Sequence, residues 1–186
     1  MLSFDRLNAG DKSIRVTMTQ RQTQRAEDRR RDIFESHRHR AFGIAYYMTG
    51  NEIEAEEILT NTFITAFSAA EEPGAQEVDA ALVGELGARL PLGAPAAPVT
   101  REEYAAGSSV LSGRNVRRTD LEEALHTLPA SERLVFLLHD VEGYKPAAIA
   151  PLLQIPEAQV NRSLISARIR IRRALAERPQ VKEKAA

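Results

Sequence analysis

The chain has 186 residues, a formal net charge of −1 and no cysteine, which excludes disulfides and thiolate metal sites and offers no overall basic charge to a nucleic acid. Apolar residues make up 43% of the sequence, yet no apolar run approaches the length of a membrane span, and the first residues lack the apolar core of a signal peptide. With almost no strand-like alternation, the sequence predicts a mostly helical cytoplasmic protein without membrane insertion, long enough for one domain or two small ones.

The first part of the chain predicts a long helix behind a loosely attached start. Residues 1–18 are polar and weakly periodic, which is typical of a disordered lead-in. A helical pattern then runs from about residue 19 to residue 48, polar all round in its front half and with an apolar stripe in its second half. We take residue 19 as the start of the first domain.

A turn after this helix predicts a helical hairpin. Gly50 is typical of the residue that follows a helix C-terminus, and Asn51 with Glu54 three residues later resembles a capping box. A second helix is expected over about residues 52–70, antiparallel to the first because the turn is tight. A weaker third helix, over about residues 76–90, completes a domain expected to end at residue 90.

The middle of the sequence predicts a linker between two domains. Residues 91–118 are dominated by proline, glycine, alanine and serine and sustain no apolar stripe, and such a long structureless stretch is unusual inside one domain. Thr119 with Glu122 is typical of the cap that opens a new helix. We therefore expect an all-α protein of two small helical domains joined by a flexible linker, with the second domain over residues 119–176 and a tail over residues 177–186.

The charges are unevenly divided between these parts. Residues 71–90 hold five acidic residues against one base, whereas residues 157–173 hold five arginines against one acid. Such a split matters more for the choice of partner than the net charge does.

A short helix, a turn and a longer helix are predicted near the C-terminus. Residues 145–153 form the first helix, Pro156 and Glu157 open the second, and the pair is typical of a helix-turn-helix that reads a DNA major groove. The alternative is a purely structural role, in which the two helices form an amphipathic hairpin and its arginines lie on a solvated surface. In the second helix Val160, Leu164, Ala167, Ile171 and Leu175 form one apolar stripe, and a helical projection places Gln159, Ser163, Ser166, Arg170 and Arg173 on roughly the opposite side.

The order of several short motifs resembles a known family, the extracytoplasmic-function sigma factors of bacterial RNA polymerase. The N-terminal likeness lies in Ala55-Glu56-Glu57 and Phe63, within a helix pair like the polymerase-binding pair of that family. The C-terminal likeness lies in Leu128-Pro129, Arg133, Gly143-Tyr144, Ile149-Ala150, Val160, Leu164 and Ala167-Arg168.

The resemblance implies binding partners and residues for them. The partners would be core RNA polymerase, promoter DNA at the −35 element and an anti-sigma factor. The polymerase would contact Glu54, Glu57, Asn61 and Thr65. DNA would contact Gln159, Arg162, Ser163, Ser166, Arg168, Arg170 and Arg173. Gln159 and Arg162 suit base edges, whereas Arg168, Arg170, Arg172 and Arg173 suit phosphates.

Some positions depart from the family. Thr60 stands where glutamine is common, Phe67 where tryptophan is common, and Gln159 where threonine is usual. No aromatic residue occurs between Phe67 and Tyr104, so residues 71–90 offer no base-stacking side chain, and their acids repel phosphates. These features argue against promoter melting.

Two other functions therefore remain open. One is a sigma-like interaction protein that binds an anti-sigma factor or core polymerase without melting promoters. The other is a helix-turn-helix regulator of another class, with its N-terminal helices serving for dimerisation. An enzyme is not expected, because the sequence holds no cysteine nucleophile, no phosphate-binding glycine loop and no histidines at ligand spacing, so neither a cofactor nor a metal is predicted.

Overall fold

The computed structural model describes residues 7–93, 98–102, 105 and 116–177, with side chains from residue 23 onward, and every regular element in these ranges is helical. This confirms the all-α prediction, whereas most of the predicted linker over residues 91–118 and of the tail over residues 177–186 lies outside the described residues. The elements are α1 (Leu7–Thr49), α2 (Glu52–Ala69), α3 (Ala75–Arg89), α5 (Arg118–His126), α6 (Ala130–Phe136), the π-helical turn η1 (Leu137–Val141), α7 (Pro146–Leu153) and α8 (Glu157–Ala176).

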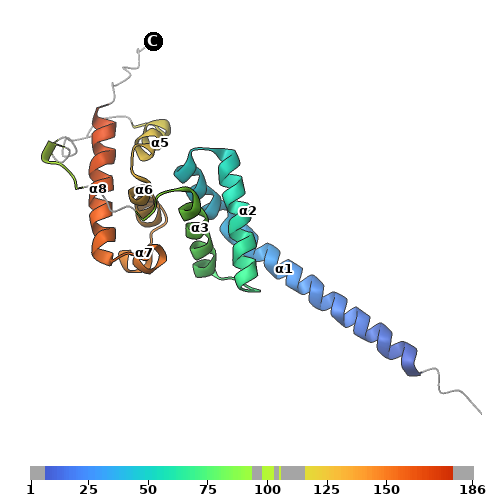
Figure 1. Cartoon of the computed structure of the whole chain (residues 1–186). Helices are drawn as coiled ribbons and strands as arrows, with labels where there is room; N and C mark the ends of the chain where they lie inside the picture. The colour runs from blue at the N-terminus through green and yellow to red at the C-terminus, as the bar shows by residue number, and fades with distance from the viewer. Residues whose placement is uncertain (1–6, 94–97, 103–104, 106–115, 178–186) are drawn as a thin grey trace, which may run out of the picture.

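Helix α1 is longer than the sequence pattern predicted. It begins at Leu7, inside the predicted lead-in over residues 1–18, and its front half projects away from the rest of the molecule (Figure 1). The apolar stripe begins only in the second half of α1, where Ala41, Ile44 and Met48 are buried. The periodicity of apolar residues therefore located the part of α1 that packs, and it could not locate the part that projects.

The first three helices form one packed unit. The side chain of Asn51 caps α2, since its Oδ1 accepts hydrogen bonds from the backbone N–H groups of Ile53 and Glu54 at 2.9 and 3.3 Å. Gly50 adopts a φ of 72°, a left-handed conformation that glycine enters without steric cost. The tight turn thus places α2 against α1, as predicted, and α3 packs against both.

The last helices form a second unit around α8, which packs against α5, α6 and α7. Helix α5 begins one residue earlier than predicted and uses a different cap. The backbone N–H of Arg117 donates to Asp120 Oδ2 at 3.0 Å, in place of the predicted pairing of Thr119 with Glu122. Arginine is not a typical capping residue, so the usual residue preferences gave no signal for this cap.

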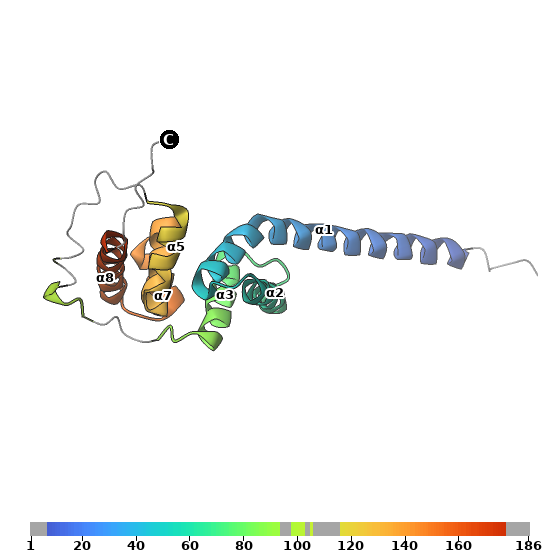
Figure 2. The ribbon, with the colours of Figure 1, turned by 90° about the horizontal axis from the view of Figure 1, so that it is seen from above.

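The two units pack directly on each other and share one hydrophobic core. Helix α3 lies beside α7, and the C-terminal end of α1 lies beside α5 and α6 (Figure 2). Burying both sets of apolar side chains in one cluster stabilises this arrangement at about 25 cal/mol per Å² of apolar area. The buried members of the cluster from both units include Ile44, Met48, Leu82, Leu86, Leu134, Leu138, Ile149, Val160 and Leu164.

A buried polar cluster crosses the boundary between the units. Asp79 of α3, with a side chain that is 5% exposed, forms an ion pair with Arg40 of α1 at 2.5 Å. Tyr144, from the loop before α7, donates its hydroxyl hydrogen to Asp79 and accepts a hydrogen bond from Arg40 Nη1 at 2.8 Å. Burial and the hydrogen bond to Asp79 raise the pKa of Tyr144 to about 12, so its hydroxyl remains protonated and able to donate at neutral pH.

Arg133 of α6 makes a second polar contact between the units. Its Nη1 donates to the carbonyl oxygen of Met48, near the C-terminus of α1, at 2.7 Å. Its Nη2 donates to the carbonyl oxygens of His126 and Leu128 at 2.9 and 3.0 Å. One guanidinium therefore donates hydrogen bonds to carbonyl groups near the C-terminal ends of α1 and α5. The last carbonyl groups of a helix have no N–H partner within the helix itself.

His126 gives this contact a dependence on pH. Burial and the neighbouring Arg133 charge, 3.1 Å from Nδ1, lower the pKa of His126, while Glu122 opposes the shift. In the unfolded chain this histidine becomes protonated below about pH 6.5. At the same pH a smaller fraction of the folded chain carries this proton. We therefore expect the free energy of unfolding to be greatest above about pH 6.5 and to decrease as the pH falls from that value through the lower pKa of His126 in the folded chain.

The measurement is the free energy of urea unfolding as a function of pH for the wild type and for His126→Gln. The wild type is expected to lose stability faster below about pH 6.5 than the variant. His39→Gln, which changes an exposed histidine of α1, is the control and should keep the wild-type slope. Equal slopes for the wild type and His126→Gln would contradict the prediction.

Candidate nucleic-acid interface

The helix-turn-helix formed by α7 and α8 is set by a left-handed turn and buried apolar side chains. Gln154 adopts a φ of 54°, and the N–H of Ile155 donates to the carbonyl oxygen of Ala150 at 3.0 Å, which ends α7. Pro156 then precedes the first turn of α8. Ile149 and Val160 are fully buried, so they hold α7 and α8 at a fixed angle to each other.

Helix α8 is buried over a wider arc than its apolar stripe predicted. Ser163 and Ser166 are only 2% and 3% exposed, and Ser166 Oγ donates to Glu132 Oε2 at 3.0 Å. Arg170, with a side chain that is 15% exposed, pairs with Glu132 Oε1 at 2.8 Å, and the Glu132 side chain is fully buried. The prediction that Ser163, Ser166 and Arg170 lie on the outer face of α8 is therefore wrong.

The physical reason is that a buried carboxylate on α6 draws these polar groups inward. Burying Glu132 requires hydrogen-bond donors around it, and α8 supplies a hydroxyl and a guanidinium one turn apart. Serine is also small enough to pack against a neighbouring helix. A projection that treats every polar residue as outward-facing cannot detect such a pair.

The exposed face of α8 is a row of residues that includes three arginines. Arg162 and Arg168, two of the residues proposed to contact DNA, lie on it although the helical projection did not include them, whereas Gln159 and Arg173 are partly buried at its margins. Sequence reasoning missed Asn161 and Ile165, although Ile165 is 57% exposed, because an isoleucine on a helix is ordinarily assigned to the core. The full face consists of Ala158, Asn161, Arg162, Ile165, Arg168 and Arg172.

Two of the predicted arginines have acidic partners on the surface. Arg168 forms two hydrogen bonds with Asp140 of η1, at 3.0 and 2.6 Å, which raise the pKa of its guanidinium and fix its orientation. Arg173 pairs with Glu177 at 2.7 Å. Arg168 is thus held in place at the edge of the exposed face, whereas Arg173 lies at the margin of that face.

A second candidate surface lies on α2, on the opposite side of the packed helices from α8 (Figure 1). Glu57 and Thr65 are exposed, and Glu54 and Asn61 are partly exposed, so all four predicted polymerase-contacting residues are accessible. Ile53 and Ile64 are 70% and 60% exposed, which sequence reasoning missed. A shallow open hollow on this surface is lined by Ile53, Glu56, Glu57, Thr60 and Asn61.

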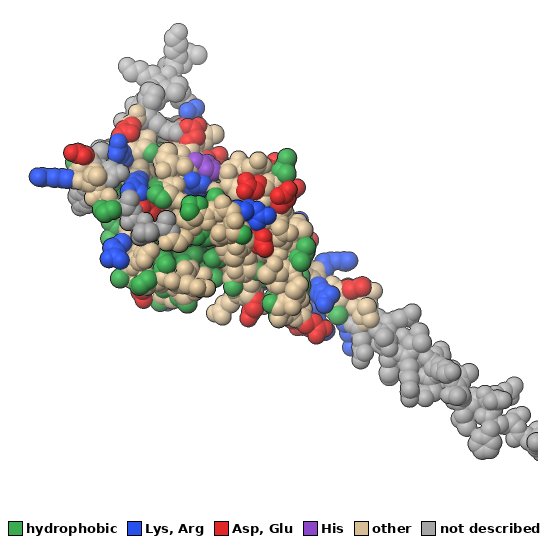
Figure 3. All heavy atoms as spheres, viewed as in Figure 1, with side chains coloured by type: hydrophobic (Ala, Val, Ile, Leu, Met, Phe, Trp, Pro, Cys, Tyr) green, Lys and Arg blue, Asp and Glu red, His purple; other side chains and the backbone are tan. Residues whose placement is uncertain are grey.

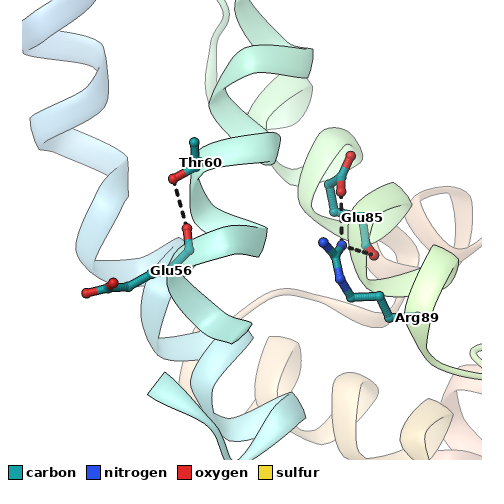
Figure 4. Close-up of polar contacts among 4 residues, drawn as sticks. All are labelled: Glu56, Thr60, Glu85 and Arg89. Atoms are coloured by element: carbon teal, nitrogen blue, oxygen red, sulfur yellow. Dashed lines mark hydrogen bonds and ion pairs between the residues drawn. The ribbon is translucent and has the colours of Figure 1, made fainter. Parts of the chain in front are cut away.

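Close contacts define what this surface presents to a partner. Thr60 Oγ1 donates to the carbonyl oxygen of Glu56 at 2.9 Å, so its hydroxyl is already engaged within α2 (Figure 4). The Glu56 carboxylate points away from Thr60 (Figure 4), and Glu56 is exposed. The surface therefore combines free carboxylates with exposed isoleucine side chains, a composition suited to a protein partner with basic and apolar groups.

Helix α3 presents an acidic and small-residue surface. Glu77, Ala80, Gly84 and Gly87 are exposed on it. The one arginine of this helix, Arg89, pairs with Glu85 Oε2 at 3.1 Å, which compensates its charge (Figure 4). Acidic side chains also gather over the neighbouring α2 in the space-filling view (Figure 3). This surface is poorly suited to unpaired bases or phosphates.

The described residues give no sign of a metal centre or a membrane span. No group of three or more histidine, aspartate or glutamate side chains among them is placed to hold a metal ion. None of the helices in the described part of the chain is both long and apolar enough to cross a bilayer.

Comparisons with known proteins agree with this geometry. Residues 118–177 match the family described as sigma-70, region 4. A similar solved structure is the co-crystal structure of the sigma factor RpoE in complex with the anti-sigma factor NepR from Bartonella quintana. The TM-score is 0.55 at 14% sequence identity, over 79% of this chain and 94% of that chain. No curated protein sequence matches the chain.

The match of residues 118–177 assigns a DNA-binding domain to α5, α6, η1, α7 and α8. Residues 118–177 therefore form a sigma-70 region 4 domain, and the chain as a whole shares its fold with the solved sigma factor structure.

Proposed function

We propose that the protein is a sigma factor that directs promoter-specific transcription initiation, with α8 reading the −35 element. The observation that carries this proposal is the exposed face of α8, where Arg162, Arg168 and Arg172 follow one another along the second helix of a helix-turn-helix. The positive charges of such a row complement the negative phosphates beside a DNA major groove, and the groove is wide enough to hold the helix that carries them.

The position of each arginine along α8 suggests its role. Arg162 lies near the N-terminus of α8, the end of a recognition helix that contacts base edges, and a guanidinium suits the O6 and N7 acceptors of guanine. Arg168 and Arg172 lie farther along the helix and suit phosphates, which position the protein on DNA without specifying a sequence. Gln159, at the margin of the face, suits an adenine.

The proposed partner of the α2 surface is core RNA polymerase. Glu57, Asn61 and Thr65 are accessible on α2, and the two exposed isoleucines, Ile53 and Ile64, supply the apolar anchors that protein interfaces need. Because the α2 and α8 surfaces lie on opposite sides of the packed helices, one molecule can bind polymerase and DNA at the same time. An anti-sigma factor is proposed as a further partner, since the similar structure was solved with one.

A second candidate function is supported by α3. An acidic surface with small residues, and an arginine already paired with Glu85, provides neither cations nor stacking groups for a melted strand. Under this candidate the protein binds core polymerase or an anti-sigma factor without opening promoters. The two functions differ in whether transcripts are made.

The experiment is reconstitution of the full chain with purified core RNA polymerase on pooled genomic promoter DNA, with complex formation and transcripts scored separately. Specific transcripts are expected for a sigma factor. A polymerase complex without transcripts would favour the second candidate. Failure to bind polymerase would overturn the sigma-factor function and would restrict the second candidate to binding an anti-sigma factor.

Replacement of Arg162 by alanine tests the role of the recognition helix. We expect a loss of roughly 1–3 kcal/mol in binding free energy and relaxed preference at one base position. The measurement is the affinity of the polymerase complex for a set of −35 duplexes changed one base pair at a time.

The matched control is Arg172→Ala on the same exposed face. As a phosphate contact, it should weaken binding equally for all duplexes and reduce the salt dependence by about one counterion. A wild-type base preference in Arg162→Ala would remove Arg162 from the reading of sequence.

A further inference from the structure

Ile165 is an apolar side chain in the middle of a polar and basic face. It is 57% exposed, whereas the neighbouring isoleucines of α8, Ile169 and Ile171, are 8% and 6% exposed and belong to the packed side of the helix. Ile165 therefore contributes little to the packing of the domain. A single exposed isoleucine is common in proteins, so its significance depends on what surrounds it.

The surroundings of Ile165 are those of a group that meets DNA. Asn161 and Arg162 lie one turn before it, and Arg168 lies one turn after it on the same exposed face. The acids near this face are Glu157, at the start of α8, and Asp140, whose charge is engaged by Arg168. Arg162, one turn before Ile165, and Arg172, two turns after it, would draw phosphates to the helix and bring the Ile165 side chain toward the bases between the two strands.

In the major groove, thymine is the base that presents a methyl group. A branched aliphatic side chain gives no hydrogen bond to a base edge, but it excludes water from that methyl group on contact. The loss of water from one methyl group corresponds to about 0.8 kcal/mol, which is about a fourfold change in affinity. The effect is large enough to select one base.

We propose that Ile165 is a specificity-determining residue that contacts the 5-methyl group of a thymine in the major groove. This inference rests on the proposed function, in which α8 reads the −35 element. It adds to that function a base preference that the arginines do not provide, because guanidinium groups prefer guanine and phosphates. The DNA site is thus expected to contain a thymine that faces Ile165, close to the base that faces Arg162, because the two residues lie one turn apart on α8.

The test uses deoxyuridine, which differs from thymine only by the missing methyl group. Duplexes that bind the full chain, alone or with core polymerase, are first selected from a random pool. Each thymine of the selected site is then replaced singly by deoxyuridine, and affinities are measured for the wild type, Ile165→Ala and Val141→Ala. Val141 has the same exposure as Ile165, 57%, but lies on η1 and is the matched control.

For the wild type we expect one thymine at which deoxyuridine weakens binding about three- to fivefold. Val141→Ala should show the same loss at the same position. Ile165→Ala should bind the thymine duplex more weakly and should no longer distinguish thymine from deoxyuridine there.

Three results would overturn the inference. One is a selected site in which no thymine is sensitive to loss of its methyl group, and another is a sensitivity that Ile165→Ala retains in full. Both leave DNA reading by α8 intact, so they separate this inference from the proposed function. Failure to select any DNA sequence would overturn the proposed function and this inference with it.

Discussion

Alanine in place of Glu132 is expected to lower the free energy of unfolding by about 3–5 kcal/mol. The Glu132 side chain is fully buried between α6 and α8, and its two oxygens accept from Ser166 and Arg170 at 3.0 and 2.8 Å. The substitution leaves a largely buried guanidinium without this carboxylate and opens a cavity between the two helices. Urea unfolding followed by circular dichroism measures the loss.

Two further variants make this prediction specific. Glu177→Ala removes an exposed ion pair with Arg173 near the end of α8 and should cost no more than about 1 kcal/mol. Glu132→Gln keeps a hydrogen-bond acceptor and most of the volume, so it should lose less stability than Glu132→Ala. A Glu132→Ala protein as stable as Glu177→Ala would show that the buried pair does not hold α8 against α6.

The second large effect is expected at Asp79. Asp79→Ala removes the acceptor shared by Arg40 and Tyr144, which lies between the two helical units, and should cost about 3–5 kcal/mol. The Arg40 side chain, 19% exposed, would keep its charge without the neighbouring carboxylate. Equilibrium unfolding gives the total loss, and hydrogen exchange of α3 and α7 shows whether the loss is concentrated where the units meet.

The controls for Asp79 separate charge from contact. Glu72→Ala breaks an exposed ion pair with Arg29 in the same unit and should cost no more than about 1 kcal/mol. Tyr144→Phe removes only the hydroxyl and should cost about 1 kcal/mol. If Asp79→Ala behaved like Glu72→Ala, the polar cluster would contribute nothing to the packing of the units.

The sequence was informative where one residue determines local structure. Asn51 identified the start of α2 because an amide side chain at that position satisfies free N–H groups of the helix. Pro156 and Glu157 identified the start of α8 for a similar local reason. The cap of α5 was missed, since it depends on a backbone N–H of Arg117 rather than on a typical capping side chain.

The candidate site was predictable only in part. The helical projection placed Ser166 and Arg170 on the outer face of α8, where they are not, and it left out Arg162 and Arg168, which are exposed there. The burial of Ser166 and Arg170 depends on Glu132, which is separated from both by more than thirty positions in the chain. Helical periodicity describes one helix at a time, so it cannot reveal a partner on another helix.

The contact between the two units had no sequence signal for the same reason. Arg40, Asp79 and Tyr144 come from three separate parts of the chain, and no spacing relates them. The apolar stripes of α1 and α3 were assigned to the core of one domain. In the folded chain the same side chains also cover apolar groups of the second unit.

The charged groups at the boundary between the two units have hydrogen-bond or ion-pair partners within their own unit. Arg40 and Asp79 both belong to the first unit, so their ion pair survives if the second unit moves away. Arg133 likewise keeps the carbonyl groups of His126 and Leu128, which lie in its own unit, and gives up only that of Met48. Each half would retain its charge compensation, and water would replace the hydrogen bonds that Arg40, Asp79 and Arg133 make across the boundary. The cost of separating the two units would therefore come mainly from exposing their shared apolar core to water, and not from leaving a buried charge without its partner.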